Sequence, residues 1–430
     1  IRMFRPMESY QKYGGVLTFA RSVGYAVVKK PEGYTTAKVD QIIQEYEKKS
    51  ANEQQSTAKQ YPNIITVVNE TFADIKVLGD FKTNEDYMPY FHSLKKNCVT
   101  GYTYASIVGG QTANTEFELL TGNTLGFLSA GTTAFQLYIH GQMPSLVSNL
   151  KAEGYSGNKA MHPFNPYNYN RPAVYKDFGF TDFIDKFDFP KNVKRVREYI
   201  SDEANVDRII SEYEKNRKKT DQPFYMYNMT IQNHSPYDKD AANFKQPIKI
   251  ESSKYDAEAN RYLNLIKYSD DSLKQLTSYF EKCKEPTIIL FLGDHQPRLT
   301  DEFMNKITNG QYQTWSSEQM MKRYQVPFVI WANYDIKEQH IEKTSMNYIQ
   351  SILTKTAGVK MTGYQRFLNE VRKEVPTITS QGYWGKNGKF YQINDKGSPY
   401  YGIIQKYRMI QYNMMFDKKN RRDSFFEVSK

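Results

Sequence analysis

Four short apolar runs, spaced along the chain, limit most strongly how it can fold. They lie at residues 63–68 (NIITVV), 224–229 (FYMYNM), 287–292 (TIILFL) and 327–331 (PFVIW). Such uninterrupted runs are typical of strands that are buried on both faces of a parallel sheet. Stretches with helical character alternate with them, at residues 143–154, 193–216, 258–283 and 346–357. The alternation predicts an α/β fold with a mostly parallel central sheet flanked by helices.

The segment before this core has a different texture. Residues 1–58 form a lead-in that contains a predicted helix over residues 35–49, followed by a polar linker. We expect Thr36 to be the N-cap of that helix, because a Thr hydroxyl can accept a hydrogen bond from a free backbone N–H of the first turn. The main domain is then expected to occupy residues 59–375.

The last part of the chain changes again. Residues 382–401 are rich in Gly, Tyr, Lys and Asn and contain short alternating stretches, and a helical pattern follows at residues 404–416. These features predict a small C-terminal α+β subdomain over residues 376–430, with antiparallel strands and a terminal helix.

The charge of the chain restricts the kind of partner. The formal net charge is +11, which favours anionic partners such as nucleic acid, anionic lipid or phosphate-rich polymers. Zinc-finger spacing, RNA-binding aromatic signatures and basic arms are absent from the sequence. We therefore expect a membrane lipid or a wall polymer as the partner, and no nucleic acid.

Cysteine content and hydropathy bear on the location of the protein. The two cysteines, Cys98 and Cys283, exclude a framework of several disulfides but leave room for one bridge. No apolar run reaches the about 18 residues of a membrane-spanning helix. The sequence begins at Ile1, without an initiating Met or a signal peptide, so we expect it to be a piece of a longer protein.

Polar residues follow three of the predicted strands directly. Glu70 follows the first strand, His234 the second, and Asp294 with His295 the third. The carboxyl ends of parallel strands meet at one edge of a sheet, which is where ligands bind in open α/β folds. Two carboxylates and an imidazole suit a divalent cation such as Mn²⁺ or Zn²⁺. Singly, Glu70 is also explained as a charge at a helix start, Asp294 as a turn former and His234 as a loop residue.

The segment 109–124 (GGQTANTEFELLTGNT) adds a possible nucleophile. Two glycines precede the hydroxyls of Thr112 and Thr115, and a hydroxyl next to a divalent cation is activated as a nucleophile. A second interpretation of this segment is an ordinary helix start with Thr112 as its N-cap. A helix start also stabilises an anionic phosphate, so both interpretations remain open.

Five short blocks occur together and in order, at residues 63–72, 110–117, 161–171, 233–237 and 293–295. As a set they resemble the lipoteichoic acid synthase family, part of the sulfatase and alkaline phosphatase superfamily. The resemblance covers roughly residues 62–363. It implies that residues 59–375 are a sulfatase-like catalytic domain.

The resemblance also implies roles for individual residues. It implies that the metal ligands are Glu70, Thr112, Asp294 and His295, with one Mn²⁺ as the expected ion and Mg²⁺ or Zn²⁺ as alternatives. Thr112 resembles the family nucleophile, and His234 resembles a histidine that contacts the substrate phosphoglycerol and takes part in proton transfer. Arg171 resembles a contact to the substrate phosphate. Tyr169 stands where the family usually has Trp. The resemblance therefore implies an aromatic side chain against the substrate headgroup, packed differently from the family's Trp.

The implied activity is transfer of sn-glycerol phosphate from phosphatidylglycerol, through a covalent glycerophospho-threonine, to a hydroxyl of a cell-envelope polymer. The acceptor is either lipoteichoic acid or a cell-wall polysaccharide of the rhamnose type, and the sequence slightly favours the polysaccharide. The family also implies an N-terminal transmembrane region, missing from this chain, and a site on the extracellular face of the membrane of a Gram-positive-type bacterium.

Other functions on this fold fit the sequence less well. A sulfatase needs a Cys or Ser within a C/S-x-P-x-R motif, and neither cysteine lies in one. Phosphoethanolamine transferases resemble the chain in using Thr but are disulfide-rich, and a two-metal phosphatase or phosphomutase needs more ligands than six His make available. Three alternatives remain open: a phosphoethanolamine transferase, a phosphodiesterase of the same superfamily, or a non-catalytic envelope-binding relative.

Overall fold

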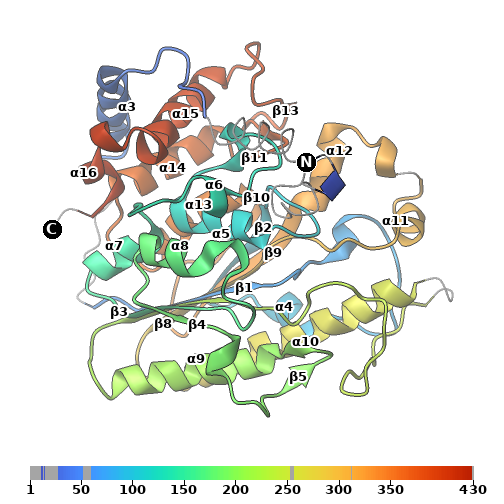
Figure 1. Ribbon diagram of the computed structural model, residues 1–430. Helices are drawn as coiled ribbons and strands as arrows, with labels where there is room; N and C mark the ends of the chain where they lie inside the picture. Colours follow the sequence, from blue (N-terminus) through green and yellow to red (C-terminus); the bar gives the residue numbers. More distant parts are fainter. Residues whose placement is uncertain are drawn as a thin grey trace.

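A sheet of eight strands runs through the centre of the protein and carries helices on both faces (Figure 1). The computed structural model describes residues 11, 12, 14, 28–51, 60–251, 256–310 and 312–428. The strand order is β10-β2-β9-β8-β1-β7-β3-β4. The strands are β1 (Asn63–Asn69), β2 (Cys98–Tyr104), β3 (Ser156–Met161), β4 (Asp182–Ile184), β7 (Phe224–Met229), β8 (Thr287–Gly293), β9 (Gln325–Ala332) and β10 (Gln339–Ser345).

Seven of these strands are parallel and only β9 is reversed. It pairs antiparallel with both β2 and β8, while the other five pairings are parallel. The mostly parallel sheet is confirmed, but the prediction that the run at residues 327–331 belongs to a parallel strand is wrong. The chain leaves β8 at its carboxyl end and returns from that same edge, and an antiparallel neighbour needs no crossover to the opposite edge.

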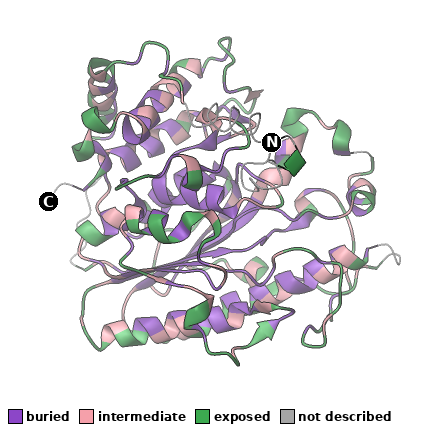
Figure 2. Ribbon diagram, in the orientation of Figure 1, coloured by how far each residue is buried: buried purple, intermediate pink, exposed green. Residues whose placement is uncertain are grey.

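Successive side chains of the central strands point to opposite faces of the sheet and pack into two separate hydrophobic cores. In β8, Ile288 and Leu290 pack into the core above the sheet, whereas Ile289 and Phe291 pack into the core below it. The upper core is covered by α5 (Thr112–Thr121), α6 (Ala134–Leu137), α7 (Leu146–Ala152), α8 (Arg171–Phe178), α13 (Met346–Thr356) and α14 (Gly363–Glu374). The lower core is covered by α4 (Pro89–Ser93), α9 (Asp202–Arg217), α10 (Ala257–Phe280) and α11 (Asp301–Ile307). Burial on both faces explains why these runs are uniformly apolar (Figure 2).

Helix capping shifts several predicted boundaries. The helix expected over residues 193–216 begins only at Asp202, because the Ser201 hydroxyl accepts a hydrogen bond from the backbone N–H of Ala204. The residues before it form a two-stranded hairpin, β5 (Arg195–Val196) and β6 (Tyr199–Ile200). In the helix predicted over residues 35–49, Thr35 rather than Thr36 is the N-cap, and its hydroxyl accepts from the backbone N–H of Lys38.

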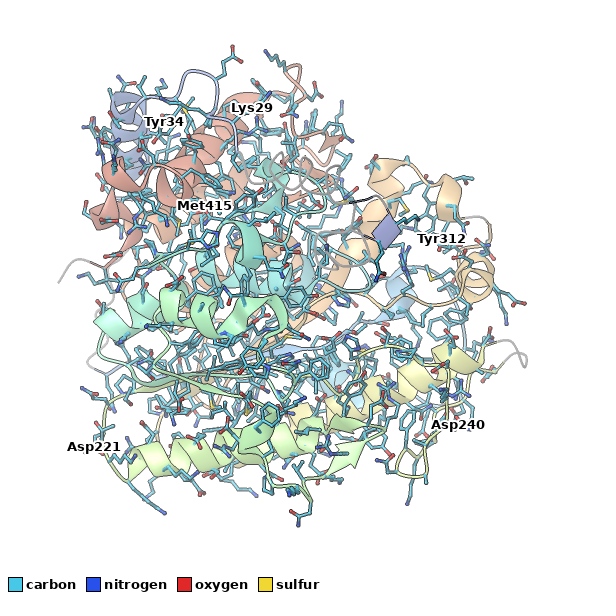
Figure 3. The ribbon with its side chains drawn as sticks, viewed as in Figure 1. Lys29, Tyr34, Asp221, Asp240, Tyr312 and Met415 are labelled. Carbon is cyan, nitrogen blue, oxygen red and sulfur yellow. The ribbon has the colours of Figure 1, made fainter. Side chains whose placement is uncertain are left out.

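The flanking segments pack onto the upper core. Helix α3 (Thr36–Lys49) lies against α14 and α15 (Tyr401–Met415). Tyr34, just before α3, donates to Asp417 (2.7 Å); Tyr34 and Met415, the last residue of α15, are labelled in Figure 3. An antiparallel sheet forms from β11 (Thr377–Thr379), β12 (Gly382–Trp384) and β13 (Phe390–Tyr391). The predicted antiparallel strands and terminal helix are thus present. Two further short helices are α12 (Ser317–Met320) and α16 (Asp423–Phe426).

The domain boundaries at residues 58/59 and 375/376 stay predictions. Buried side chains of α3 and α15 belong to the same apolar cluster as those of α5 and α13. Most of the predicted lead-in and polar linker lies outside the described residues. Cys98 and Cys283 are both free thiols. Over the described part of the chain, no helix has the length and apolar character needed to cross a membrane.

Candidate metal centre and active site

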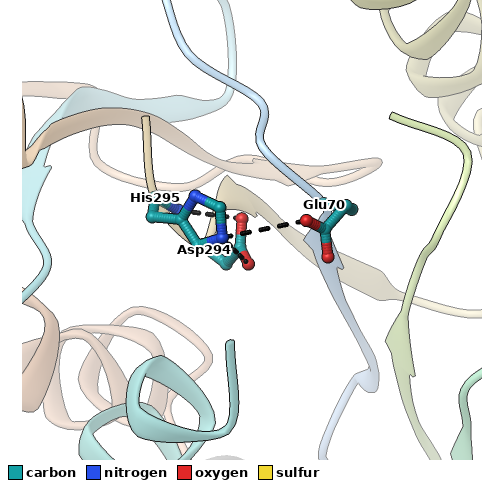
Figure 4. Close-up of side chains that lie close together, drawn as sticks. All are labelled: Glu70, Asp294 and His295. Carbon is teal, nitrogen blue, oxygen red and sulfur yellow. Dashed lines mark hydrogen bonds and ion pairs between the residues drawn. The ribbon is translucent and has the colours of Figure 1, made fainter. Parts of the chain in front are cut away.

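The carboxyl ends of β1 and β8 bring three predicted ligands together. The two strands are neighbours in the sheet, with Asn69 opposite Gly293, so the residues that follow them begin side by side. His295 Nε2 lies 3.2 Å from Asp294 Oδ2 and 3.7 Å from Glu70 Oε1 (Figure 4). One ligand atom from each of the three residues lies within 4.8 Å of the others, and all three residues are buried.

Backbone hydrogen bonds fix the two carboxylates. Asp294 Oδ1 accepts from the backbone N–H groups of Thr71 (2.6 Å) and His295 (2.8 Å), so its other oxygen is directed away from both. The Thr71 hydroxyl donates to Glu70 Oε1 (2.8 Å). Thr71 itself has φ +55°, an unfavourable conformation for a β-branched residue that the surrounding hydrogen bonds sustain.

The cluster fits a divalent cation. Asp294 Oδ2 and His295 Nε2 are buried and have no hydrogen-bond partner, which is costly unless a ligand satisfies them. His295 Nδ1 lies 2.9 Å from the Gln296 carbonyl; Nδ1 therefore carries the proton and Nε2 presents its lone pair to the carboxylates. Burial and the Asp294 carboxylate raise the pKa of Glu70, the shift that a bound cation would offset.

Thr112 lies next to Glu70 of this cluster. Gly109 (φ +67°) and Gln111 (φ +67°) turn the backbone sharply, and α5 begins at Thr112. The Thr112 hydroxyl lies 3.4 Å from Glu70 Oε2 and makes no helix cap, so the interpretation of Thr112 as a cap is wrong. The Thr115 hydroxyl instead donates to the main-chain carbonyl of Asp294 (2.8 Å). Of these two threonines, Thr112 is therefore the one whose hydroxyl faces a ligand side chain.

His234 lies at the edge of the same region. Its Nδ1 is 2.7 Å from the Ser235 carbonyl, and its ring stacks with Phe164 at 6.2 Å between centroids. Burial lowers the pKa of His234. Neutral His234 that donates through Nδ1 has an unprotonated Nε2 and can accept a proton there.

A buried arginine holds the His234 segment in place. Arg197 Nη2 donates to the carbonyls of Gln232 (2.9 Å) and His234 (2.8 Å), and its Nη1 donates to the carbonyl of Pro236 (2.7 Å). Its Nε is buried and has no hydrogen-bond partner among the described residues. The sequence did not point to Arg197, because its acceptors are main-chain atoms of a distant segment.

Arg171 lies deeper than the resemblance led us to expect. The residue is 1% exposed, and its Nε and Nη2 donate to Glu116 Oε1 (3.1 and 2.7 Å). Tyr175 and Tyr227 donate to the other oxygen of Glu116 (2.5 and 3.1 Å). The centre of the Arg171 guanidinium is 5.2 Å from the Tyr169 ring. Its role as a phosphate contact stays a prediction.

His162 is a buried histidine near the site to which the sequence gave no role. It follows β3 directly, and its Nδ1 is 2.9 Å from the Met229 carbonyl. Burial and the positive charge of Arg171 lower its pKa well below the usual value. Its position could have identified it, because His162 follows the end of a strand, as His234 and Asp294 do.

A cleft of about 800 Å³ opens beside these residues. Tyr169 and His234 line it, together with Gly110 and Gln111 just before Thr112. This volume is in the range of sites for small organic ligands. Among the predicted residues, Glu70, Thr112, Asp294 and His295 are thus brought into one cluster, while Tyr169 and His234 form a wall of the adjoining cleft.

Comparisons with known proteins agree with this arrangement. A family model described as "Sulfatase" matches residues 62–359. A putative cyclic beta-1,2-glucan modification protein of Rhizobium meliloti is 30% identical over 99% of this chain, and the chain spans 65% of that relative's length.

Two solved structures share the fold. The Streptococcus pyogenes phosphoglycerol transferase GacH, in complex with sn-glycerol-1-phosphate, has a TM-score of 0.74 and 20% identity, covering 94% of this chain and all of that one. The lipoteichoic acid synthase LtaP of Listeria monocytogenes has a TM-score of 0.63 and 19% identity, covering 90% of this chain and 98% of that one. At these identities the likeness concerns the fold alone, whereas the family model covers most of the chain, which therefore belongs to the sulfatase family.

Proposed function

We propose that this chain is the catalytic part of a phosphoglycerol transferase that moves glycerol phosphate from phosphatidylglycerol to a hydroxyl of a cell-envelope polymer. One observation carries the proposal: the Thr112 hydroxyl lies 3.4 Å from Oε2 of Glu70, which belongs to the buried cluster of Glu70, Asp294 and His295. A nucleophilic hydroxyl beside unpaired ligand atoms suits substitution at phosphorus, and it is of little use to a module that only binds.

Glu70, Asp294, His295 and Thr112 would hold a divalent cation, for which Mn²⁺ is our first choice. When bound, the cation supplies positive charge that favours the alkoxide of Thr112 and neutralises the phosphate. The backbone N–H groups at the start of α5 are aligned to stabilise the same phosphate, because helix starts carry partial positive charge.

In the first step, Thr112 Oγ attacks the phosphorus of phosphatidylglycerol. The new bond joins Oγ to phosphorus, and the bond from phosphorus to the diacylglycerol oxygen breaks. The proton lost by Thr112 ends on the departing diacylglycerol oxygen, with Nε2 of His234 as the carrier. A glycerophosphoryl group remains on Thr112.

In the second step, an acceptor hydroxyl attacks the same phosphorus. His234 Nε2 accepts its proton as the bond between phosphorus and Thr112 Oγ breaks, and the proton then returns to Thr112. His234 is suited to this task because its lowered pKa keeps it neutral near pH 7. Tyr169 supplies an aromatic wall for the glycerol phosphate, and the Arg171 guanidinium, 5.2 Å from the centre of that ring, stabilises it by a cation–π contact.

Several observations support the donor and the location. The S. pyogenes relative in fold was solved with sn-glycerol-1-phosphate, and a net charge of +11 suits work at an anionic membrane surface. We place the protein outside the cell membrane, anchored by a segment beyond this chain. A Gram-positive-type envelope stays a prediction.

The acceptor is proposed to be a saccharide hydroxyl rather than lipoteichoic acid. The R. meliloti relative, whose match spans 99% of this chain, is named for modification of cyclic β-1,2-glucan. The second candidate is a phosphodiesterase, in which water instead of a saccharide hydroxyl attacks the glycerophosphoryl group on Thr112. Both reactions would pass through the same covalent intermediate.

The test is release of diacylglycerol from phosphatidylglycerol vesicles in the presence of Mn²⁺, measured by mass spectrometry of extracted lipid. We expect release by the wild type and none by T112A, while T115V keeps it. Equal release by the wild type and T112A would refute the proposal. A saccharide product that carries glycerol phosphate separates the transferase from the phosphodiesterase.

A further inference from the structure

We propose that the cleft beside Thr112 contains a subsite for a neutral saccharide, with Tyr167 as its stacking surface and Gln111, Gln136 and Asn168 as partners for sugar hydroxyls. The inference rests on the proposed function, since it names the class of acceptor that the same site would take. All four residues line the cleft of about 800 Å³.

The exposure of Tyr167 is unusual for this protein. The residue is 79% exposed, and among the described residues only one other large hydrophobic side chain, Phe187 at 73%, is exposed to a similar degree. Tyr167 lies at the cleft, in a well-defined turn: its N–H donates to Asn165 Oδ1 (3.2 Å), and its carbonyl accepts from the N–H of Asn170 (3.2 Å). An aromatic ring held at the edge of a cleft offers an apolar face to the C–H side of a sugar ring.

Three amide side chains share the cleft with this ring. Gln111, Gln136 and Asn168 come from three different segments, and over the described residues none of their side chains has a hydrogen-bond partner. Each amide has both donors and an acceptor available, which is what a sugar hydroxyl requires because it also donates and accepts. Gln111 directly precedes Thr112, so this end of the subsite adjoins the proposed nucleophile.

Apart from the one phosphate that the metal centre would take, the charge of the cleft lining argues for a neutral acceptor. Its lining contains one Arg, Arg298, and one Glu, Glu258, and it contains no Lys or Asp. A growing glycerol-phosphate polymer carries a negative charge on every unit and would call for several cations. The chain has a net charge of +11, yet that excess lies outside this lining. The cleft therefore favours a neutral sugar chain over an anionic polymer.

The test is a binding measurement that needs no turnover. The protein, loaded with Mn²⁺, is titrated by calorimetry with a neutral glucose oligosaccharide, a neutral rhamnose oligosaccharide and a glycerol-phosphate oligomer. We expect at least one neutral sugar to bind, and at least about tenfold more tightly than the anionic oligomer. The two sugars distinguish a glucan from a rhamnose-type acceptor.

Variants locate the subsite. Y167A is expected to weaken sugar binding about tenfold, as does the double substitution Q136A/N168A, whereas F187A retains wild-type affinity because Phe187 does not line the cleft. The inference is overturned if neither sugar binds the wild type, if the anionic oligomer binds at least as tightly, or if Y167A binds as the wild type does. Sugar binding without any covalent product on Thr112 would refute the proposed reaction and leave the subsite standing.

Discussion

The hydroxyl of Thr115 donates a hydrogen bond to the main-chain carbonyl of Asp294 (2.8 Å), which ties the first turn of α5 to the end of β8. That bond uses the Thr115 hydroxyl for structure and leaves the Thr112 hydroxyl facing Glu70. The two threonines lie one helical turn apart and therefore have separable roles.

The first prediction compares these two residues. T112A is expected to reduce diacylglycerol release at least about 10³-fold, since it removes the nucleophile. T115V keeps the shape of the side chain but leaves the Asp294 carbonyl unpaired, which is expected to cost about 1–3 kcal/mol of stability. Lipid release and urea unfolding, measured on both variants, check the two expectations. A larger loss of activity in T115V than in T112A would contradict them.

The second prediction concerns metal binding. At about 100 times its dissociation constant, Mn²⁺ is expected to raise the free energy of unfolding by about 2.7 kcal/mol. E70Q and D294N remove a charged ligand each and are expected to lose this stabilisation, while the exposed E302Q keeps it. Thermal unfolding with and without Mn²⁺, after treatment with a chelator, measures the difference. Equal stabilisation of all four proteins would place the ion elsewhere.

The third prediction concerns the buried pair of Arg171 and Glu116. R171M leaves the Glu116 carboxylate without its cation and is expected to lower stability by about 3–5 kcal/mol. The double variant R171M/E116Q removes the charge that was left behind, so we expect it to recover part of the loss. Urea unfolding of the single and double variants checks this. If the double variant is no more stable than R171M, the pair is not the cause.

The fourth prediction concerns the pH dependence of the reaction. Burial, with a contribution from the positive charge of Arg197, lowers the pKa of His234 below its usual value of about 6.5. If the reaction needs neutral His234, its rate should therefore fall only when the pH drops below about 6.5. R197M removes the nearby charge and is expected to move this acidic limb to higher pH, as read from kcat/KM profiles. R195M, which replaces an exposed neighbour, is the control and is expected to keep the acidic limb of the wild type. An acidic limb of R197M that also equals that of the wild type would argue against this coupling.

The fifth prediction concerns stability, through His92. The carboxylates of Asp74 (3.7 Å from Nε2) and Asp86 (2.7 Å from Nδ1) raise the pKa of His92 to about 9. The resulting stabilisation is fully present below the unfolded value of about 6.5 and is lost as pH rises through about 9. H92Q should thus lower the melting temperature at pH 6 and not at pH 10. The effect is at most about 1 kcal/mol, because solvent screens the partly exposed ring. An equal loss at both pH values would contradict it.

The sequence predicted the parts of this fold that depend on local pattern. The uniformly apolar strands β1, β7 and β8 were recognisable because both of their faces are buried. The strands β2 (CVTGYTY) and β3 (SGNKAM) were missed, because polar and Gly residues interrupt their apolar character. The reversed direction of β9 depends on the path of the connection before it, and no local pattern contains that information.

The same division holds for the site. Glu70, Asp294 and His295 were predicted from their positions after strands, and the sheet brings them within 4.8 Å of one another. The choice between Thr112 and Thr115 depends on how α5 is rotated against the Asp294 carbonyl, which only the packed structure defines. The hydrogen bonds of Arg197 join segments about 35 residues apart, beyond the reach of any spacing rule.

The most direct test of the central claim is the intact mass of the protein after incubation with Mn²⁺ and phosphatidylglycerol. We predict a glycerophosphoryl increment on the wild type that maps to Thr112 after digestion and is absent from T112A. An increment that persists in T112A, or that maps to another residue, would contradict the assignment of Thr112 as the nucleophile.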